Sequence, residues 1–219
     1  MNSQPGVFVA TLTMLTASAM AIAIKAIPIV TPHRLELTRE YAREHYGIDS
    51  YELKDPQMIV VHFTETHSLA EAVAVFRPET ISSARRELKD FGNVNVGVHF
   101  LVDRDGSIYS LLPTNIMGRH VIGFNYTSIG IENVAMRPKD LTAQQAIADA
   151  ALIEDLLHRF PSIRFLIGHH EYMNRDAPHF ALFTEQDPGY HPTIKTDPGP
   201  EFMSDLRARL AKENVTLQQ

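Results

Sequence analysis

The chain has 219 residues, 44% of them hydrophobic and 21% charged, which is enough for one domain with a full hydrophobic core. A formal net charge of -6 argues against a nucleic-acid-binding protein, which would usually carry a basic face. The lack of cysteine excludes disulfides and thiolate zinc sites, whereas eleven histidines indicate metal or acid–base chemistry.

An uncharged apolar run covers residues 7–24. Its length fits an export signal or a single membrane anchor, and small residues at 17–21 offer cleavage sites. The leader before it has no Lys or Arg, and a buried N-terminal helix is the alternative. We expect residues 1–24 to be a signal peptide or N-terminal membrane anchor, and the protein to be exported to the periplasm or cell envelope.

Residues 25–56 are expected to form a linker and a short helix. Prolines interrupt the first part, and Thr38 and Gly47 fit the N-cap and the stop of a helix over 38–46.

The following segment, residues 57–212, alternates apolar strands with helices. The strands are expected at 58–63, 97–102, 107–112, 128–134 and 164–167, and the helices at 69–76, 80–89, 142–160 and 201–212. The dipeptide Asp105-Gly106 predicts an antiparallel hairpin, and Thr142 with Gln145 fits a capping box. The prediction is a single α/β domain with a central mixed β-sheet flanked by helices, followed by a frayed tail at 213–219.

Three possible metal ligands follow from this arrangement. His62 ends one predicted strand, His169 lies just past another, and Asp197 stands in a loop that can return to them. These are nitrogen and oxygen donors that zinc accepts, and three of them would leave an open catalytic position. Each has a structural explanation when taken singly, as a buried histidine, a loop histidine and a turn aspartate. Together they predict a zinc site at the strand ends.

Two further charged residues could act beside such a metal. Asp197 precedes a proline and is therefore extended, so Lys195 two residues earlier should point to the same side. Glu132 lies in an otherwise apolar strand and could move protons if it faces the site. The alternatives are an ordinary surface lysine and a glutamate that faces solvent.

Six short motifs occur in order along residues 57–210. They are Val61-His62-Phe63-Thr64, Val98-His99-Phe100-Leu101-Val102-Asp103-Arg104-Asp105-Gly106, Arg119-His120, Ser128-Ile129-Gly130-Ile131-Glu132, Ile167-Gly168-His169 and Lys195-Thr196-Asp197-Pro198-Gly199-Pro200. The set resembles the zinc-dependent N-acetylmuramoyl-L-alanine amidases of the type-2 amidase and peptidoglycan-recognition-protein superfamily.

This resemblance implies hydrolysis of the amide between the muramic acid lactyl group and L-alanine, in peptidoglycan or muropeptides. It implies Zn²⁺ on His62, His169 and Asp197, catalytic roles for Glu132 and Lys195, and a substrate groove along Arg119, His120 and Asn125. We expect no cofactor besides zinc, a monomer, and membrane contact only through an uncleaved N-terminal segment.

Two features depart from the family's pattern. Val98 stands where some members have a catalytic tyrosine, and the loop over 170–194 is longer than in compact members. That loop contains Asp187-Pro188-Gly189, a second Asp-Pro-Gly segment. Asp197 is the favoured ligand, because only there does a lysine stand two residues earlier.

Two other functions fit the same pattern. A peptidoglycan-recognition domain would bind muropeptides without cutting them, but such domains lose a zinc ligand, and this sequence keeps all three. A zinc peptidase that cuts within the stem peptide stays open at the sequence level.

Overall fold

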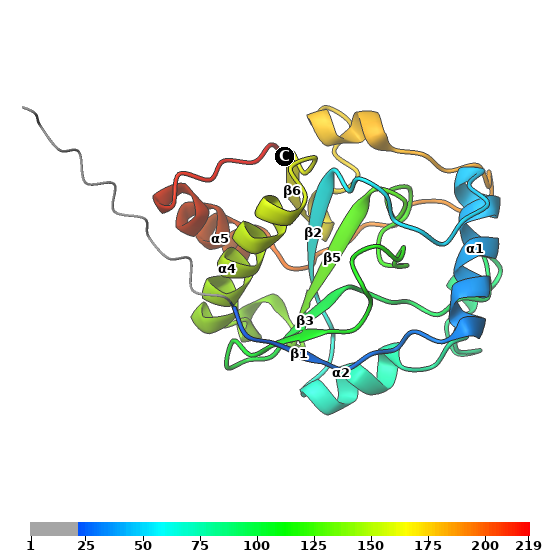
Figure 1. The fold of residues 1–219 in the computed structure, drawn as a ribbon, viewed down its shortest axis with the longest axis horizontal. Coiled ribbons are helices and arrows are strands. Elements are labelled where there is room, and N and C mark those ends of the chain that lie inside the picture. Colours follow the sequence, from blue (N-terminus) through cyan, green and yellow to red (C-terminus); the bar gives the residue numbers. More distant parts are fainter. Residues whose placement is uncertain (1–21) are drawn as a thin grey trace, which may run out of the picture.

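The computed structural model describes residues 22–219, in which a mixed sheet lies between helices (Figure 1). Its strands are β1 Ile24–Ala26, β2 Met58–Phe63, β3 Phe100–Val102, β4 Ile108–Ser110, β5 Ser128–Asn133 and β6 Phe165–Gly168. They are ordered β1-β4-β3-β5-β2-β6, with β3 and β4 antiparallel and the other pairs parallel. The predicted α/β class, the mixed sheet and the hairpin are confirmed.

The helices are α1 Pro32–Tyr46, α2 Leu69–Phe76, α3 Arg86–Lys89, α4 Ala143–Arg159 and α5 Pro200–Lys212. Short 3-10 turns cover Pro138–Asp140, His169–Glu171 and Pro178–Leu182. The capping box of α4 is present, because the Thr142 side chain accepts from the backbone N–H of Gln145 and the Gln145 side chain accepts from the N–H of Thr142. The residues of this capping box therefore determine where α4 begins.

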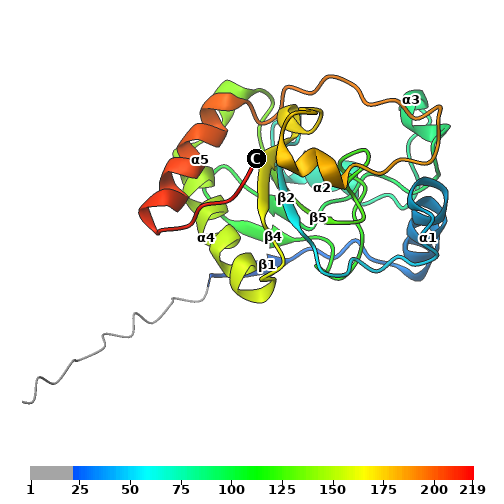
Figure 2. The ribbon, with the colours of Figure 1, turned by 90° about the horizontal axis from the view of Figure 1, so that it is seen from above.

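Alternation along the central strands gives the sheet two different faces. Ile59 and Val61 of β2 belong to the core shared with α4 and α5, whereas Met58 and Val60 pack with residues of α1. His62 continues the second series. Figure 2 shows α4 with α5 and α1 on opposite sides of the molecule, so His62 lies on the α1 side of the sheet.

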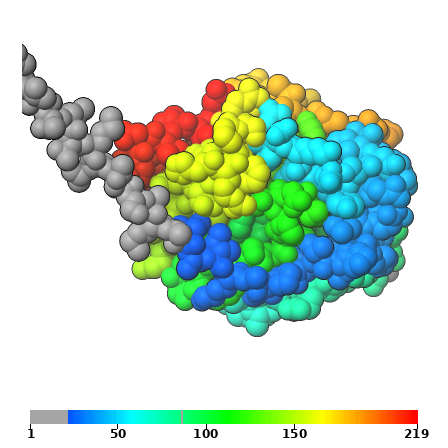
Figure 3. Space-filling view, viewed as in Figure 1, coloured from blue at the N-terminus to red at the C-terminus, as the bar shows by residue number. Residues whose placement is uncertain are grey.

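The N-terminal part of the domain contains more regular structure than the predicted linker and short helix. β1 pairs in parallel with β4, and α1 begins at Pro32 with Thr31 as its N-cap. The Thr31 side chain accepts from the backbone N–H of Arg34, a cap that precedes the expected one at Thr38. The helix ends at Gly47 (φ 68°), as predicted. In the space-filling view this blue segment lies along the lower and right-hand parts of the domain (Figure 3).

Residues 80–89 and the C-terminal tail also differ from expectation. Only four residues of the first segment form α3, because Ile81 donates its backbone N–H to Asn93 rather than to a helical carbonyl. The tail is not frayed, since Gln218 exchanges backbone hydrogen bonds with Arg164 and Leu166 beside β6.

The apolar run at 7–24 falls mostly on residues 1–21, outside the described residues. Its last part, including Ile22 and Ile24, packs against the core beside α4. Across residues 22–219, no helix combines the length and apolar character needed to cross a membrane.

Candidate metal centre and active site

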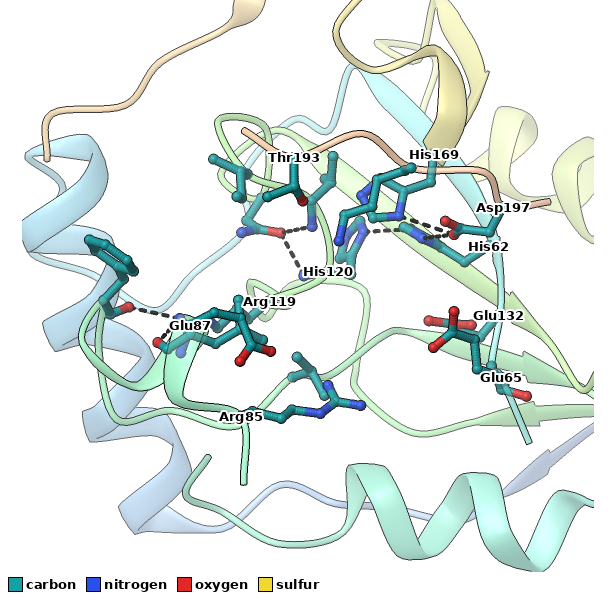
Figure 4. Close-up of a pocket in the computed structure, with 18 of the residues that line it drawn as sticks. His62, Glu65, Arg85, Glu87, Arg119, His120, Glu132, His169, Thr193 and Asp197 are labelled. Atoms are coloured by element: carbon teal, nitrogen blue, oxygen red, sulfur yellow. Dashed lines mark hydrogen bonds and ion pairs between the residues drawn. The ribbon is translucent and has the colours of Figure 1, made fainter. Parts of the chain in front are cut away.

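Pairing of β2 with β6 brings the two predicted histidine ligands together. Val61 is the register partner of Gly168, so His62 in β2 and His169, which directly follows β6, lie at the same sheet edge. Asp197 reaches this edge from the loop before α5, and its carbonyl accepts from the backbone N–H of His170 at 2.8 Å. Figure 4 shows the three side chains facing one another.

The donor atoms of this triad are close enough to share one ion. Asp197 Oδ2 lies 3.1 Å from Nδ1 of His62 and 3.0 Å from Nδ1 of His169. One possible ligand atom from each residue lies within 4.8 Å of the other two. Two imidazole nitrogens and one carboxylate oxygen are a donor set of catalytic zinc, which keeps a further position open. The residues therefore fit a zinc ion.

Burial and hydrogen bonding together favour protonation states that suit metal ligands. Burial lowers the pKa of His169 to about 4, with the charge of His62 acting in the same direction. Burial by itself would raise the pKa of Asp197, but hydrogen bonds from His169 and His62 outweigh it and leave that pKa below its ordinary value. A neutral imidazole and an ionised carboxylate are the forms that bind metal.

The triad opens into a cavity of about 670 Å³. The chain over 189–197 forms part of its wall, and Figure 2 shows the orange chain returning from beside α3 toward α5. The wall also includes the chain around α3 and residues within 119–125. A ligand can therefore approach the triad from the α1 side of the sheet.

Glu132 lies on β5 as the register partner of His62 and lines the same cavity. Its Oε2 is buried and has no hydrogen-bond partner within the described chain. Burial raises the pKa of Glu132 well above its ordinary value, the charge of Asp197 adds to this, and Arg85 opposes it. A carboxyl group with a raised pKa can both accept and return a proton. The solvent-facing alternative does not describe this side chain.

Lys195 also lines the cavity and is half-buried, while Thr196 is exposed and Asp197 turns back toward the histidines. Thr196 lines the same cavity as its two neighbours. The ammonium charge contributes to the lowered pKa of His169. A cation and the metal triad therefore face one space.

Arg119 is 4% exposed, and its guanidinium is used inside the protein. It donates to the carbonyl oxygens of Leu88, Phe91, Gly92 and Val94 at 2.7–3.0 Å. It also lies over the ring of Tyr41, 4.8 Å from the centroid. These contacts hold the chain around α3 in place, and the predicted contact of Arg119 with substrate stays a prediction.

Asn125 is 1% exposed and is likewise bonded internally. Its Oδ1 accepts from the backbone N–H groups of His120 and Val121, and its Nδ2 donates to the hydroxyls of Tyr41 and Tyr46. The side chain fixes the turn that carries His120. A substrate contact for Asn125 also stays a prediction.

His120 is drawn close to the metal triad. Its Nδ1 lies 3.1 Å from Nε2 of His62, the ring nitrogen that does not face Asp197. Burial lowers the pKa of His120 well below its ordinary value, with the charges of His62, His99 and His169 acting in the same direction. Burial therefore favours the neutral form of the ring.

The second Asp-Pro-Gly segment does not reach the triad. Asp187 Oδ1 accepts from the backbone N–H of Gly189 at 2.7 Å, which is a local turn contact. Glu171, another acid of the loop over 170–194, pairs with Arg207 at 2.6 Å. Neither acid belongs to the cluster of donors around His62.

Sequence reasoning missed several residues of the cavity wall. Glu65 and Arg85 line it, and the rings of Phe91 and Tyr190 stack there at 4.4 Å. Arg85 falls in a segment predicted as helix, and no motif marks it or Glu65. Their positions follow from how loops far apart in sequence meet.

The sequence profile of the N-acetylmuramoyl-L-alanine amidase family matches residues 52–200. The chain belongs to this family. The matched span includes the triad, Glu132 and Lys195, and it covers β2 to β6 of the sheet.

Two curated proteins are similar in sequence to parts of the chain. Human peptidoglycan recognition protein 3 is 27% identical over 160 residues, which are 70% of this chain and 45% of that protein. The chain thus spans less than half the length of this relative. The endolysin of Enterobacteria phage K11 is 28% identical over 108 residues, 47% of this chain and 71% of the endolysin.

The fold is also found in a solved amidase. N-acetylmuramoyl-L-alanine amidase LysC from Clostridium intestinale superposes with a TM-score of 0.52 at 22% identity. The superposition covers 89% of this chain and all of LysC, so this chain and LysC share the fold described above.

Proposed function

We propose that this chain is a zinc-dependent N-acetylmuramoyl-L-alanine amidase. Its reaction would be hydrolysis of the amide between the lactyl group of N-acetylmuramic acid and L-alanine, in peptidoglycan or muropeptides. One observation carries the proposal: a single cavity holds the His62, His169 and Asp197 triad together with Glu132 and Lys195. Membership of the amidase family supports the choice of bond.

Zinc held by the triad would supply Lewis-acid chemistry, that is, activation of water and polarisation of a carbonyl group. Glu132 takes the proton from the attacking water, since its buried carboxylate makes no competing hydrogen bond within the described chain. It returns that proton to the L-alanine nitrogen as the C–N bond breaks. Lys195 faces the negative charge that develops on the carbonyl oxygen.

The cavity wall gives the substrate its place beside these groups. We assign a structural role to Arg119 and Asn125. Their hydrogen bonds fix the chain around α3 and the turn at 120–121, which form part of the cavity wall. Other residues that line the cavity, such as Arg85 and the Phe91–Tyr190 stack, would contact the muropeptide.

Metal content and product analysis test the proposal together. The purified protein should hold one zinc ion per chain, and His62→Ala, His169→Ala and Asp197→Ala should each lose it. Asp187→Ala should keep it, and the reverse result for the two aspartates would transfer the ligand role to Asp187. A defined muropeptide should yield a peptide with a free L-alanine amino group. Cleavage within the stem peptide would indicate a peptidase, and binding without cleavage a recognition domain.

We further propose that the protein acts outside the cytoplasm, because its proposed substrate lies there and the run at 7–24 is apolar enough to direct export. An alkaline-phosphatase fusion to residues 1–35 should be active outside the cytoplasm. An inactive but stable fusion would instead favour an enzyme that acts on fragments inside the cell.

A further inference from the structure

His120 connects a proposed metal ligand to the interior of the sheet. Its Nδ1 lies 3.1 Å from Nε2 of His62, and its Nε2 lies 3.4 Å from the hydroxyl of Ser128. Ser128 is fully buried at the start of β5. Because Nδ1 of His62 faces Asp197, each nitrogen of the His62 ring has one defined neighbour.

The space around the His120 ring is shaped by two glycines. A Cβ atom at Gly130 would lie 2.9 Å from ring atoms of His120, and one at Gly118 would lie 3.0 Å from its Cδ2. Contacts under 3.0 Å force a shift, so any side chain at Gly130 would push the ring from its place. The ring stands at 90° to that of His62, with the centroids 5.2 Å apart. The strand therefore leaves a fitted site for this imidazole.

The hydrogen bonds allow one arrangement of protons when Nδ1 of His62 binds a metal. The His62 proton then resides on Nε2 and is donated to Nδ1 of His120. His120 carries its own proton on Nε2 and donates it to the Ser128 hydroxyl. Metal-bound histidines in proteins generally donate their other N–H in this way, which fixes the ring and its tautomer.

We propose that His120 is a positioning residue that holds His62 with Nδ1 directed at the metal site. This differs from the substrate-groove role predicted for His120 from the family resemblance. The inference depends on the proposed function only through the metal site, not through the bond that is cut.

Two substitutions separate the hydrogen bond from the volume of the ring. His120→Phe keeps a ring of similar size without an acceptor, and His120→Asn offers an amide oxygen where Nδ1 stands. Zinc affinity is measured by competition with a chromophoric chelator, and Co²⁺ absorption spectra report the ligand geometry. We expect His120→Phe to weaken zinc binding about 10–100-fold, and His120→Asn to recover most of that loss.

Matched controls address general effects of changing a buried histidine. His45 is 1% exposed and bonds to Glu185 and to the Phe91 carbonyl, away from the triad. His45→Phe should keep the zinc affinity and Co²⁺ spectrum of the wild type. Ser128→Ala removes only the hydrogen bond between Ser128 and His120, and it should lower the zinc affinity less than His120→Phe does.

Several results would overturn the inference. Wild-type zinc affinity in His120→Phe with an increased KM would return His120 to the substrate groove. Equal losses of zinc affinity in His120→Phe and His120→Asn, with the affinity of Ser128→Ala unchanged, would show that His120 acts only through packing. If His120→Phe does not fold, the zinc affinities of His120→Asn and Ser128→Ala decide the outcome. If the variants show the expected order of zinc affinities but the wild-type protein cuts no muropeptide, the proposed function is refuted and this inference stands.

Discussion

Glu132 shows how one residue's role depends on its neighbour in the sheet. Alternation along its own strand allows either a solvent-facing or a site-facing side chain, and the sequence leaves the choice open. The register of β5 against β2 decides it, because Glu132 pairs with His62 and the two side chains emerge on one face.

Replacing this carboxylate should separate catalysis from metal binding. Glu132→Gln preserves the shape but cannot accept a proton, so we expect kcat to fall by about 10²–10⁴-fold with the zinc content unchanged. Steady-state kinetics on a defined muropeptide and metal analysis provide the measurement. Glu154→Gln on α4, on the other side of the sheet, is the control and should keep wild-type kcat. Near-normal turnover in Glu132→Gln would remove Glu132 from the mechanism.

Lys195 should affect the transition state rather than the binding of substrate. Its ammonium faces the cavity beside the triad, where negative charge develops during attack on the amide. Lys195→Ala should lower kcat by about 10²–10³-fold with little change in KM. An increase in KM at constant kcat would instead show that Lys195 binds the substrate in its ground state.

At the scale of an element, Arg119 anchors the segment that contains α3. Its four hydrogen bonds to carbonyl oxygens act together, so Arg119→Met should destabilise the fold by about 3 kcal/mol. Hydrogen exchange should become faster mainly over residues 86–94, while α4 stays protected. Unchanged exchange there with an increased KM would support the substrate contact predicted from the sequence.

The packing of α4 on the sheet contains a buried carboxyl group. Asp149 is fully buried and accepts from Nδ2 of Asn133 at 2.9 Å. Burial raises its pKa from 3.8 to about 7. The folded state thus favours the protonated form, and the stability this provides is present below about pH 4 and lost as the pH rises through 7.

Asp149→Asn should remove that dependence. Relative to the wild type, the variant should gain about 2–3 kcal/mol of unfolding free energy between pH 5 and pH 8. Urea denaturation at several pH values measures the difference. Asp155→Asn, in the exposed ion pair with Arg159 on the same helix, should follow the wild-type curve. A constant difference between Asp149→Asn and the wild type would show that Asp149 is ionised in the fold.

At the scale of the whole molecule, the sequence predicts what is encoded locally and misses what depends on distant contacts. The Thr142 capping box and the Asp105-Gly106 turn involve neighbouring residues, and both are found as predicted. The start of α1 was missed, although the Thr31 cap is local, because Thr38 offered a competing cap.

Some features of the candidate site could likewise be predicted from the sequence, and others could not. The triad could be predicted because strand ends of a parallel sheet meet at one edge. The internal use of Arg119 could not, because its partners are backbone carbonyls in and after α3, 25–31 residues earlier in the chain. Sequence patterns identify side chains that can bind, but the fold decides which of them stay free to do so.

The central claim for the molecule concerns which bond it breaks, and hydrolysis of purified sacculi in heavy-oxygen water tests this most directly. Mass spectrometry should find the heavy oxygen in the lactyl carboxylate of muramic acid, together with unlabelled stem peptides that begin with L-alanine. His169→Ala should give neither product. Heavy oxygen in a carboxylate of the stem peptide, with the lactyl group still joined to L-alanine, would contradict the account.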